Sequence, residues 1–360
     1  MSDIRFGLVG CGKIAERHAN LLGQGEVAGA SLGAVCDVNG ELAGDFGRRF
    51  GVVGFGSIEE MMGSGRVNAV TVLTPSGVHA GNVVELARHG VPIVVEKPMA
   101  LRLEDADRMI EACDRHGVKL FVVKQNRMNR SVKALRGALE AGRFGRLTLG
   151  TVRVRWCRRQ AYYDSAQWRG TWEHDGGVLA NQASHHIDLL VWMMGEVESV
   201  FAKASRALAN IEAEDMAVVT LRFKSGALGV IEATTATRPR DLEGSLSLLG
   251  EKGAVVIGGF AANELVTWDF ENGAPEDADI FETHGRNPEH PFGFAHKCYY
   301  EHVVDCINHD GQQMVDGLEG RRSLELISAI YESVDTGHEV VPGSGRANCR
   351  LGRPAGKGDV

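Results

Sequence analysis

The sequence lacks the features of a membrane-spanning, secreted or nucleic-acid-binding protein. Its longest apolar runs, such as residues 67–75, are far shorter than the ~20 residues that span a bilayer, and the first ten residues hold no apolar segment of the signal-peptide kind. Acidic residues outnumber basic ones by 47 to 39, a formal net charge of −8. A protein that binds nucleic acid needs a basic surface, which this charge balance does not favour. We therefore expect a cytoplasmic protein that binds neither membrane nor nucleic acid.

Cysteines are few and dispersed. The 360 residues contain seven of them, with no CxxC pair and no Cys/His cluster at the spacing of a zinc site. Neither disulfides nor a metal site is therefore expected. Hydrophobic residues make up 44% of the chain, which suffices for a folded core. At about 150 residues per domain, the length predicts two domains.

Residues 4–125 alternate short apolar runs with amphipathic stretches. The runs are IRFGLVG, SLGAVCD, AVTVLTP, PIVVEKP and KLFVVKQ, and helix-like segments separate them. Continuous β-branched runs between helices are typical of a parallel sheet that is buried on both faces. The first domain, residues 1–125, is therefore predicted to be a doubly wound α/β domain.

The pattern changes to consecutive strands in the second domain, residues 126–342. Strands are expected at 147–156, 197–206, 215–223, 227–235, 245–249 and 253–257, and helices near 181–194, 296–309 and 318–334. Short turns between consecutive strands favour a mostly antiparallel sheet. The Gly- and Arg-rich end, residues 343–360, is predicted to be a flexible tail.

A glycine-rich loop directly follows the first predicted strand. The segment Gly10-Cys11-Gly12-Lys13-Ile14-Ala15 fits the G-x-G-x-x-A pattern, which brings backbone amides and a helix N-terminus to a pyrophosphate. Asp37 ends the second strand, where a carboxylate can accept both ribose hydroxyls of adenosine and repel a 2′-phosphate. These features predict a Rossmann domain that binds NAD rather than NADP. The alternative is a glycine turn that merely joins strand to helix.

Polar residues also follow the later strands of the first domain. One group follows each of three strands: Thr74, Pro75 and His79; Glu96 and Lys97; and Gln125, Asn126 and Arg127. The carboxyl ends of strands in an open α/β sheet line the ligand crevice, so we expect Lys97 and Asn126 where nicotinamide and substrate meet. The alternative for Lys97 is a solvated surface lysine.

A polar stripe interrupts an apolar segment of the second domain. Asn181, His185 and Asp188 are spaced i, i+4 and i+7, which would align them on one face of a helix. Histidine suits proton transfer near neutral pH, and the adjacent His186 should point into a different environment. A hydrogen-bonded structural histidine is the alternative. One His and one Asp are too few for a metal site.

Residues 152–172 combine arginines with aromatic residues. The segment contains five arginines, three tryptophans and only one acidic residue, Asp164. The arginines and tryptophans are Arg153, Arg155, Arg158, Arg159 and Arg169, with Trp156, Trp168 and Trp172. Guanidinium groups match phosphate and carboxylate, and aromatic faces stack on bases or sugars. This composition indicates an anion pocket, although an oligomer interface would show it too.

These motifs occur in the order found in the glucose-fructose oxidoreductase / inositol dehydrogenase / MocA family, which the chain resembles to about residue 342. The resemblance rests on GCGKIA with Asp37, TPSGVH, EKP and the GG-x-L-x-N-x-x-x-H-x-x-D run. It implies a Rossmann domain followed by an α/β domain with an open, mostly antiparallel sheet that mediates homodimers or homotetramers. Family members mostly oxidise or reduce a sugar or cyclitol hydroxyl with NAD(P).

Three further segments resemble one branch, the UDP-N-acetyl-2-amino-2-deoxy-D-glucuronate 3-dehydrogenases of bacterial surface polysaccharide (lipopolysaccharide) biosynthesis. They are FVVKQNR, YYDSAQWRGTW and NQASHHIDLL. The resemblance implies oxidation of the 3-hydroxyl of a UDP-N-acetylglucuronate-type sugar. Some branch members reoxidise NADH with 2-oxoglutarate, and no residue here decides this point. One departure is FAHKCYY (294–300), where the branch more usually has Gly-His-Pro before the tyrosine pair.

The resemblance assigns site residues position by position. Lys97 and His185 become the catalytic pair, and Asn181, which replaces the usual family aspartate, can orient His185 but cannot stabilise an imidazolium by charge. We favour His185 as the base, with Lys97 holding the alkoxide; the reverse stays open. The expected cofactor contacts are Gly10, Gly12, Lys13, Ile14, Asp37, Thr74, Pro75, His79, Glu96, Lys97, Gln125 and Trp168. The expected substrate contacts are Lys97, Asn126, Arg127, Arg158, Arg159, Tyr163, Arg169, Asn181 and His185.

Two other functions fit parts of the pattern. A dehydrogenase of a free sugar or inositol would share Lys97 and His185 without needing the arginine-rich segment. A non-catalytic dinucleotide sensor would be expected to lose one of these two residues, and both are present.

Overall fold

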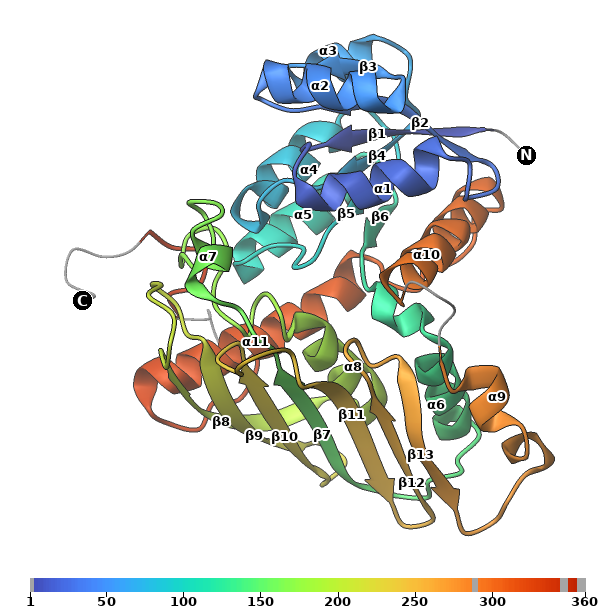
Figure 1. Cartoon of the computed structure of the whole chain (residues 1–360), viewed down its shortest axis with the longest axis vertical. Coiled ribbons are helices and arrows are strands. Elements are labelled where there is room, and N and C mark those ends of the chain that lie inside the picture. The colour runs from blue at the N-terminus through green and yellow to red at the C-terminus, as the bar shows by residue number, and fades with distance from the viewer. Residues whose placement is uncertain (1–2, 287–290, 344–348, 355–360) are drawn as a thin grey trace. The chain divides into compact units, whose positions relative to one another are not determined.

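The computed structural model describes residues 3–286, 291–343 and 349–354, and the chain divides into two compact units (Figure 1). The first unit comprises Met1–Ala100, Glu104–Lys124 and His296–Arg321; the second comprises Leu101–Leu103, Gln125–Ala295 and Arg322–Val360. The sequence had assigned all of residues 296–321 to the second domain, whereas their contacts join them to the first unit. Among the described residues, every helix is too short or too polar to cross a membrane.

The first unit is built on a six-stranded sheet in the order β3-β2-β1-β4-β5-β6, with every pair parallel. The strands are β1 (Ile4–Val9), β2 (Ala30–Cys36), β3 (Val53–Phe55), β4 (Ala69–Val72), β5 (Ile93–Val95) and β6 (Leu120–Val122). The helices that connect them are α1 (Lys13–Gly23), α2 (Gly40–Phe50), α3 (Ile58–Gly63), α4 (His79–Ala87) and α5 (Leu103–Arg115), with the 3-10 turn η1 (Ser76–Val78) after β4. Strands β4 to β6 are fully buried, as both faces of a helix-covered sheet require. The predicted doubly wound Rossmann domain is confirmed.

The segment 296–321 packs closely on this sheet. It holds the end of helix α10 (Pro291–Asn308) and the start of α11 (Gly317–Thr336). The Tyr300 ring lies edge-on to Phe6 at 5.2 Å. At Gly320, a Cβ would lie only 2.6 Å from the Val122 side chain. Glycine therefore permits the close contact between helix and strand that includes this late segment in the first unit.

The second unit contains a seven-stranded sheet in the order β13-β12-β11-β7-β10-β9-β8. Its strands are β7 (Leu147–Arg155), β8 (Val197–Ser205), β9 (Met216–Phe223), β10 (Leu228–Thr234), β11 (Glu243–Gly250), β12 (Gly253–Gly258) and β13 (Glu264–Phe270). All neighbours are antiparallel except β7 and β10, so the mostly antiparallel sheet is confirmed. In β9 exposed and buried residues alternate, because one face is covered and the other is open.

Helices of the second unit cover one face of this sheet (Figure 1). The unit contains η2 (Gln125–Met128), α6 (Arg130–Glu140), α7 (Gln160–Tyr163), α8 (Ser184–Met194), η3 (Pro275–Asp277), α9 (Ile280–His284) and the greater part of α11. Helix α8 packs against β7 and β11. Gly150 of β7 makes this packing close, because a Cβ there would lie 2.8 Å from the Met194 side chain.

Helix α8 begins three residues later than the polar stripe suggested. Asn181 lies in a turn before the helix, closed by hydrogen bonds from the Asn181 amide to the Gly177 carbonyl and from Ala183 to Val178. The Ser184 hydroxyl donates to the Asn181 carbonyl at 2.7 Å, which satisfies a polar group at the helix start. The interpretation that placed Asn181 on one helical face with His185 and Asp188 is therefore wrong, since only the latter two are helical.

Part of the predicted flexible tail is packed. Cys349 and Leu351 are buried, and the Gly352 amide donates to the Trp172 carbonyl at 2.8 Å. Arg350 pairs with Asp335 and lies 4.7 Å from the Trp172 ring. Residues 349–352 thus belong to the folded second unit. Residues 344–348 and 355–360 of the predicted tail lie outside the described residues.

Candidate active site

The glycine-rich loop has the geometry of a phosphate cradle. Gly10 adopts φ +99°, and a Cβ there would lie 2.9 Å from the backbone of Leu73 and Thr74, so only glycine fits. Gly12 precedes α1, and a Cβ on it would meet nothing within 4 Å. The open space next to a helix N-terminus leaves room for a pyrophosphate. Lys13 and Ile14 follow, both exposed.

Asp37 connects this loop to the next one. Its Oδ2 accepts a hydrogen bond from the Cys11 amide at 2.8 Å, and its Oδ1 accepts one from the Asn39 amide at 2.9 Å. The Asn39 side chain in turn caps α2 by accepting from two amides of its first turn. A carboxylate has about four acceptor positions. The two that remain on Asp37 suit the ribose hydroxyls of NAD.

Thr74 and His79 organise the loops after β4 and β5. The His79 ring contacts the Thr74 carbonyl through Nε2 at 2.8 Å and the Pro98 carbonyl through Nδ1 at 3.0 Å. Burial lowers the pKa of His79, and a neutral ring can donate its single N–H to only one of these two carbonyls at a time. The Thr74 hydroxyl is buried and has no hydrogen-bond partner among the described residues. An unpaired buried hydroxyl is costly, so this atom fits a cofactor contact, whereas His79 is a positioning residue. Pro75, between them, caps the 3-10 turn η1.

The Glu96 carboxylate points into the first unit. Its Oε2 accepts from the Lys97 backbone amide at 2.9 Å, and its Oε1 contacts His18 Nε2 at 3.1 Å and His296 Nε2 at 3.7 Å. Burial opposes ionisation, but the hydrogen bonds from both histidines outweigh it and hold the pKa of Glu96 well below its usual value. The side chain predicted to contact the cofactor therefore positions the backbone of Lys97, whose peptide bond to Pro98 is cis.

His18, Glu96 and His296 have the composition of a metal site, with ligand atoms within 4.8 Å of one another. Hydrogen bonding accounts for the arrangement instead. His18 Nδ1 contacts the Tyr300 hydroxyl at 2.7 Å, and Arg17 Nε donates to His296 Nδ1 at 3.4 Å. With Nδ1 as an acceptor, His296 carries its proton on Nε2, which then faces Glu96 and not a metal. The absence of a metal stays a prediction.

In the second unit, η2 is joined to α8 by a buried ion pair. Arg127 donates through Nε and Nη2 to the two carboxylate oxygens of Asp188, each at 2.8 Å, and the side chains are 2% and 3% exposed. The guanidinium also lies 4.6 Å from the Trp192 ring. Asn126, also buried, donates to the Ala261 carbonyl at 3.2 Å. Both residues were predicted to bind substrate, and the structure uses their side chains for internal packing.

His185 and its neighbour occupy different environments, as predicted. His185 is partly exposed, and its Nε2 lies 3.1 Å from the side-chain nitrogen of Gln125. His186 is fully buried beside Trp156, and burial lowers its pKa to about 4. His186 is therefore neutral at physiological pH.

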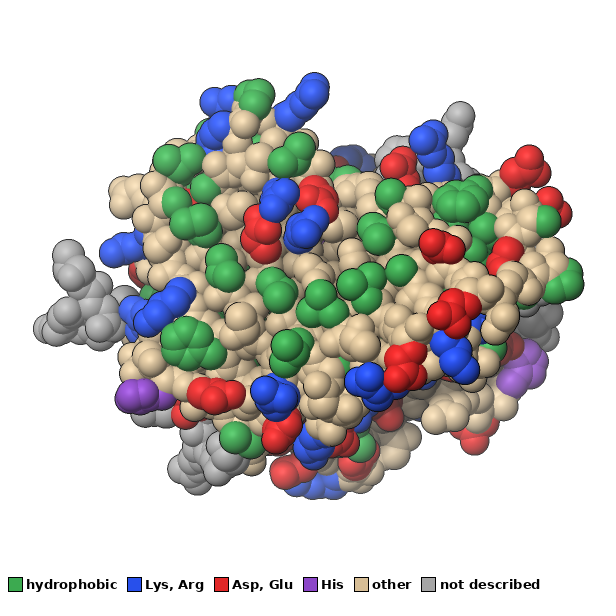
Figure 2. Space-filling model, turned by 90° about the horizontal axis from the view of Figure 1, so that it is seen from below, with side chains coloured by type: hydrophobic (Ala, Val, Ile, Leu, Met, Phe, Trp, Pro, Cys, Tyr) green, Lys and Arg blue, Asp and Glu red, His purple; other side chains and the backbone are tan. Residues whose placement is uncertain are grey.

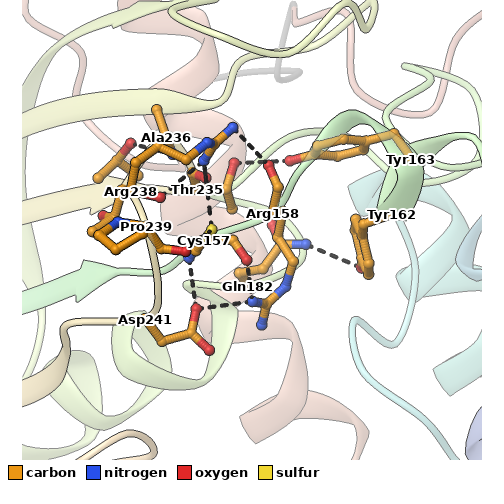
Figure 3. Close-up of polar contacts among 12 residues, drawn as sticks. Cys157, Arg158, Tyr162, Tyr163, Gln182, Thr235, Ala236, Arg238, Pro239 and Asp241 are labelled. Carbon is orange, nitrogen blue, oxygen red and sulfur yellow. Dashed lines mark hydrogen bonds and ion pairs between the residues drawn. The ribbon is translucent and has the colours of Figure 1, made fainter.

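The arginine-rich segment contains two groups of hydrogen-bonded side chains, and Figure 3 shows the contacts of Arg158, Tyr162 and Tyr163. Arg158 donates to Asp241 at 3.0 Å, and the Tyr163 hydroxyl contacts that of Thr235 at 2.8 Å. Tyr163 is thereby buried and engaged. Arg159 precedes α7 and is exposed.

Tyr162 is the centre of the second group. It accepts from Arg169 at 2.7 Å and from Gln182 at 3.3 Å, and the Arg169 guanidinium lies 4.5 Å from both the Tyr162 and Trp168 rings. Sequence reasoning missed Gln182, Asp241 and Arg238, whose guanidinium donates to the Arg158 carbonyl at 3.2 Å. Their roles depend on contacts across 20 to 84 positions, which spacing does not reveal.

The model of an oxidoreductase family with an NAD-binding Rossmann fold matches residues 4–124, and the model of its C-terminal α/β domain matches residues 136–342. The chain belongs to the GFO/IDH/MocA oxidoreductase family. It is therefore an NAD-dependent sugar dehydrogenase whose cofactor is NAD.

Two solved structures of this family are similar over nearly the whole chain. The WlbA dehydrogenase from Bordetella pertussis in complex with NADH and UDP-GlcNAcA is 45% identical, with a TM-score of 0.90, and the match covers 94% of this chain and 98% of that one. The WlbA dehydrogenase from Chromobacterium violaceum, with the same two ligands, is 40% identical, with a TM-score of 0.89 and coverage of 96% and 97%. Myo-inositol 2-dehydrogenase of Thermotoga maritima is 32% identical over 235 residues, 64% of this chain and 68% of that protein.

Within the GFO/IDH/MocA family, the departure at Asn181 has a structural counterpart. The Asn181 amide donates to Asp175 Oδ1 at 2.6 Å, and Asp175 Oδ2 accepts from the Gly170 amide at 2.8 Å. The carboxylate of Asp175 thus accepts a hydrogen bond from the side chain of Asn181, at the position where other family members usually have an aspartate. Sequence reasoning missed Asp175, because residues before a glycine pair show no helical spacing.

Proposed function

We propose that the chain oxidises the 3-hydroxyl of a UDP-linked N-acetylglucuronate, with NAD as hydride acceptor, for bacterial surface polysaccharide biosynthesis. The observation that carries this proposal is the 45% identity, across 94% of the chain, to a dehydrogenase whose structure holds NADH and UDP-GlcNAcA. The inositol dehydrogenase relative is less similar and matches less of the chain.

In the proposed reaction, bound NAD would supply the hydride acceptor, and side chains of the protein remove the proton of the substrate hydroxyl. His185 takes the proton of the substrate hydroxyl, since the ordinary pKa of histidine, near 6.5, suits a base at neutral pH. Lys97 donates a hydrogen bond to the same oxygen and stabilises its developing negative charge. The Glu96 carboxylate supports Lys97 by holding its backbone amide. If His185→Ala kept the pH-rate profile and Lys97→Met lost it, the two roles would be exchanged.

The substrate also presents a diphosphate and a carboxylate. Arg159 and Arg169 are the arginines that we propose for these anions, because Arg127 and Arg158 are already paired with Asp188 and Asp241. Arg159 is exposed, and the Arg169 guanidinium stacks on aromatic rings that can also contact a base or sugar. Charge reversal at Arg159 should raise KM for the sugar nucleotide and leave the affinity for NAD unchanged.

The open face of the seven-stranded sheet is the surface that we propose for homodimers or homotetramers. Apolar side chains project from it on β8, β9, β10 and β11: Phe201, Val218, Leu228 and Leu249, which are 37%, 52%, 49% and 37% exposed. Apolar side chains also gather in the middle of the face seen in Figure 2, with charged side chains around them. An apolar patch with a charged rim is typical of a protein interface.

A substrate panel tests the proposed function. Purified protein and NAD are mixed with UDP-N-acetylglucuronate, UDP-N-acetylglucosamine, inositol or glucose, each with and without 2-oxoglutarate, and NADH absorbance is followed. We expect turnover with the uronate alone. If 2-oxoglutarate regenerates NAD, it should suppress NADH accumulation while product continues to form. Turnover with inositol or glucose alone would replace the nucleotide sugar by a free polyol. No turnover with any substrate, despite NAD binding, would favour a dinucleotide sensor.

A further inference from the structure

The side chains of Gln125 and His185 are in contact, and the proposed reaction assigns no role to Gln125. The Gln125 carboxamide is buried, and its nitrogen lies 3.1 Å from His185 Nε2. The other amide atom, Oε1, is also buried and has no hydrogen-bond partner among the described residues. A buried carboxamide normally satisfies both of its ends. The contact with His185 therefore accounts for the nitrogen of this amide, and Oε1 can accept a further hydrogen bond.

The neighbouring contacts hold Gln125 at a fixed place against α8. Two residues further on, Arg127 joins η2 to α8 through its paired hydrogen bonds with Asp188. Asn126 and Asn129 each donate to the Ala261 carbonyl, which holds the rest of η2. A hydrogen bond between two parts of one rigid arrangement orients an imidazole at little entropic cost.

We propose that Gln125 is the positioning residue of His185, and that its carboxamide serves both protonation states of the ring. When His185 is neutral, the Gln125 N–H donates to the unprotonated Nε2. When Nε2 carries a proton, rotation of the carboxamide by 180° presents Oε1 as the acceptor. No other hydrogen bond to Oε1 has to break among the described residues. No bond to carbon forms or breaks, and Gln125 neither gains nor loses a proton; the proton that distinguishes the two states is bound or released by His185.

The charged and titratable groups named below, on α8 and on the elements packed against it, are paired or neutral. Arg127 and Asp188 neutralise each other, and His186 is held neutral by burial. Buried residues of β7 and β11 are mostly apolar, among them Val152, Val154, Leu246 and Leu248. Asp175 faces Asn181 in the preceding turn. A charge introduced at position 125 would lie within hydrogen-bond distance of His185 Nε2 and should act on the ring directly.

The test is the titration of His185 by NMR in apo protein, with the histidine resonance assigned by its loss in His185→Gln. Gln125→Glu places a carboxylate beside Nε2, which favours the imidazolium, so the pKa of His185 should rise by about one unit or more. The matched control is Gln24→Glu, the same change at an exposed position in the first unit, which should leave the His185 titration unchanged. An unchanged His185 titration in folded Gln125→Glu protein would overturn the proposal.

A second variant covers the case in which Gln125→Glu does not fold. Gln125→Asn keeps the amide but withdraws it by one methylene, so kcat should fall about tenfold, as expected for one lost hydrogen bond, while KM and NAD affinity stay within about twofold. A loss of NAD affinity would instead support the cofactor contact that the family resemblance implies for Gln125. Equal losses in kcat and NAD affinity, or none in kcat, would contradict a positioning role.

Only the kinetic readouts depend on the proposed function. If His185 is the base, the acid limb of the kcat/KM profile should move to higher pH in Gln125→Glu, in parallel with the NMR titration. A shifted NMR titration with an unshifted acid limb would support the Gln125 contact and reject His185 as the base. The two failures are thus distinguishable.

Discussion

The buried ion pair between Arg127 and Asp188 tests whether Arg127 stabilises the fold or binds the substrate. We predict that Asp188→Asn destabilises the protein by about 3–5 kcal/mol. The Asn side chain keeps the shape but leaves the guanidinium uncompensated, in a place where both side chains are only 2–3% exposed. Two hydrogen bonds of 2.8 Å lose their charged acceptor in this variant. Arg127→Met should destabilise the protein by a similar amount, because it leaves the buried Asp188 carboxylate without its guanidinium partner.

The double variant Arg127→Met/Asp188→Leu provides the control. It removes both charges, so its destabilisation should be smaller than the sum of the single losses by at least about 2 kcal/mol. Urea denaturation followed by tryptophan fluorescence measures these differences, and the KM for UDP-N-acetylglucuronate is measured on the folded variants. We expect stability to fall and KM to change little. An Arg127→Met protein of near-normal stability with a strongly raised KM would refute the reasoning and restore Arg127 as a substrate residue.

Three further predictions address the cofactor loop, a buried acid and the sheet face. Gly10→Ala should weaken NAD binding at least tenfold, because its Cβ would lie 2.9 Å from backbone atoms at φ +99°; calorimetry showing unchanged affinity would reject this geometry. Burial raises the pKa of Glu214 to about 7, above its ordinary 4.5, so the folded state retains a proton that the unfolded chain releases, and stability should decline as the pH rises from about 4.5 to 7. Glu214→Gln should flatten that decline in urea midpoints measured between pH 5 and 8, and an equally steep decline would show that Glu214 is not its source. Leu228→Glu, which places a charge at a 49% exposed site on the open sheet face, should convert oligomers to monomers in light scattering, and an unchanged mass would exclude this face as the interface.

Features that depend on neighbouring residues could be predicted from the sequence. The glycine-rich loop, Asp37 and the β-branched runs each combine residues within one strand–helix unit, and the structure places them as expected. The alternation along β9 likewise follows from one covered and one open face. Strand β3 and helix α3 were not predicted, because three and six residues are too few for periodicity to indicate an element.

Features that depend on distant residues could not be predicted. Arg127 was interpreted as a substrate residue because the sequence does not reveal its partner. That partner is Asp188, 61 positions away, which accepts hydrogen bonds from the guanidinium. The Glu96 carboxylate turns inward because His18 and His296 come from α1 and α10, which only the fold brings together. Asn181 was assigned to a helix because the i, i+4 spacing continues one turn beyond the true start at Ser184.

The most direct test of the central claim is deuterium transfer from carbon 3 of the substrate. UDP-N-acetylglucuronate labelled with deuterium at carbon 3 is incubated with the enzyme and NAD, and the reduced cofactor is analysed by mass spectrometry. The account predicts NADH that is one mass unit heavier than the product from unlabelled substrate. Unlabelled NADH would place the oxidation at another carbon, and the absence of any NADH, with 2-oxoglutarate left out, would contradict the proposed reaction.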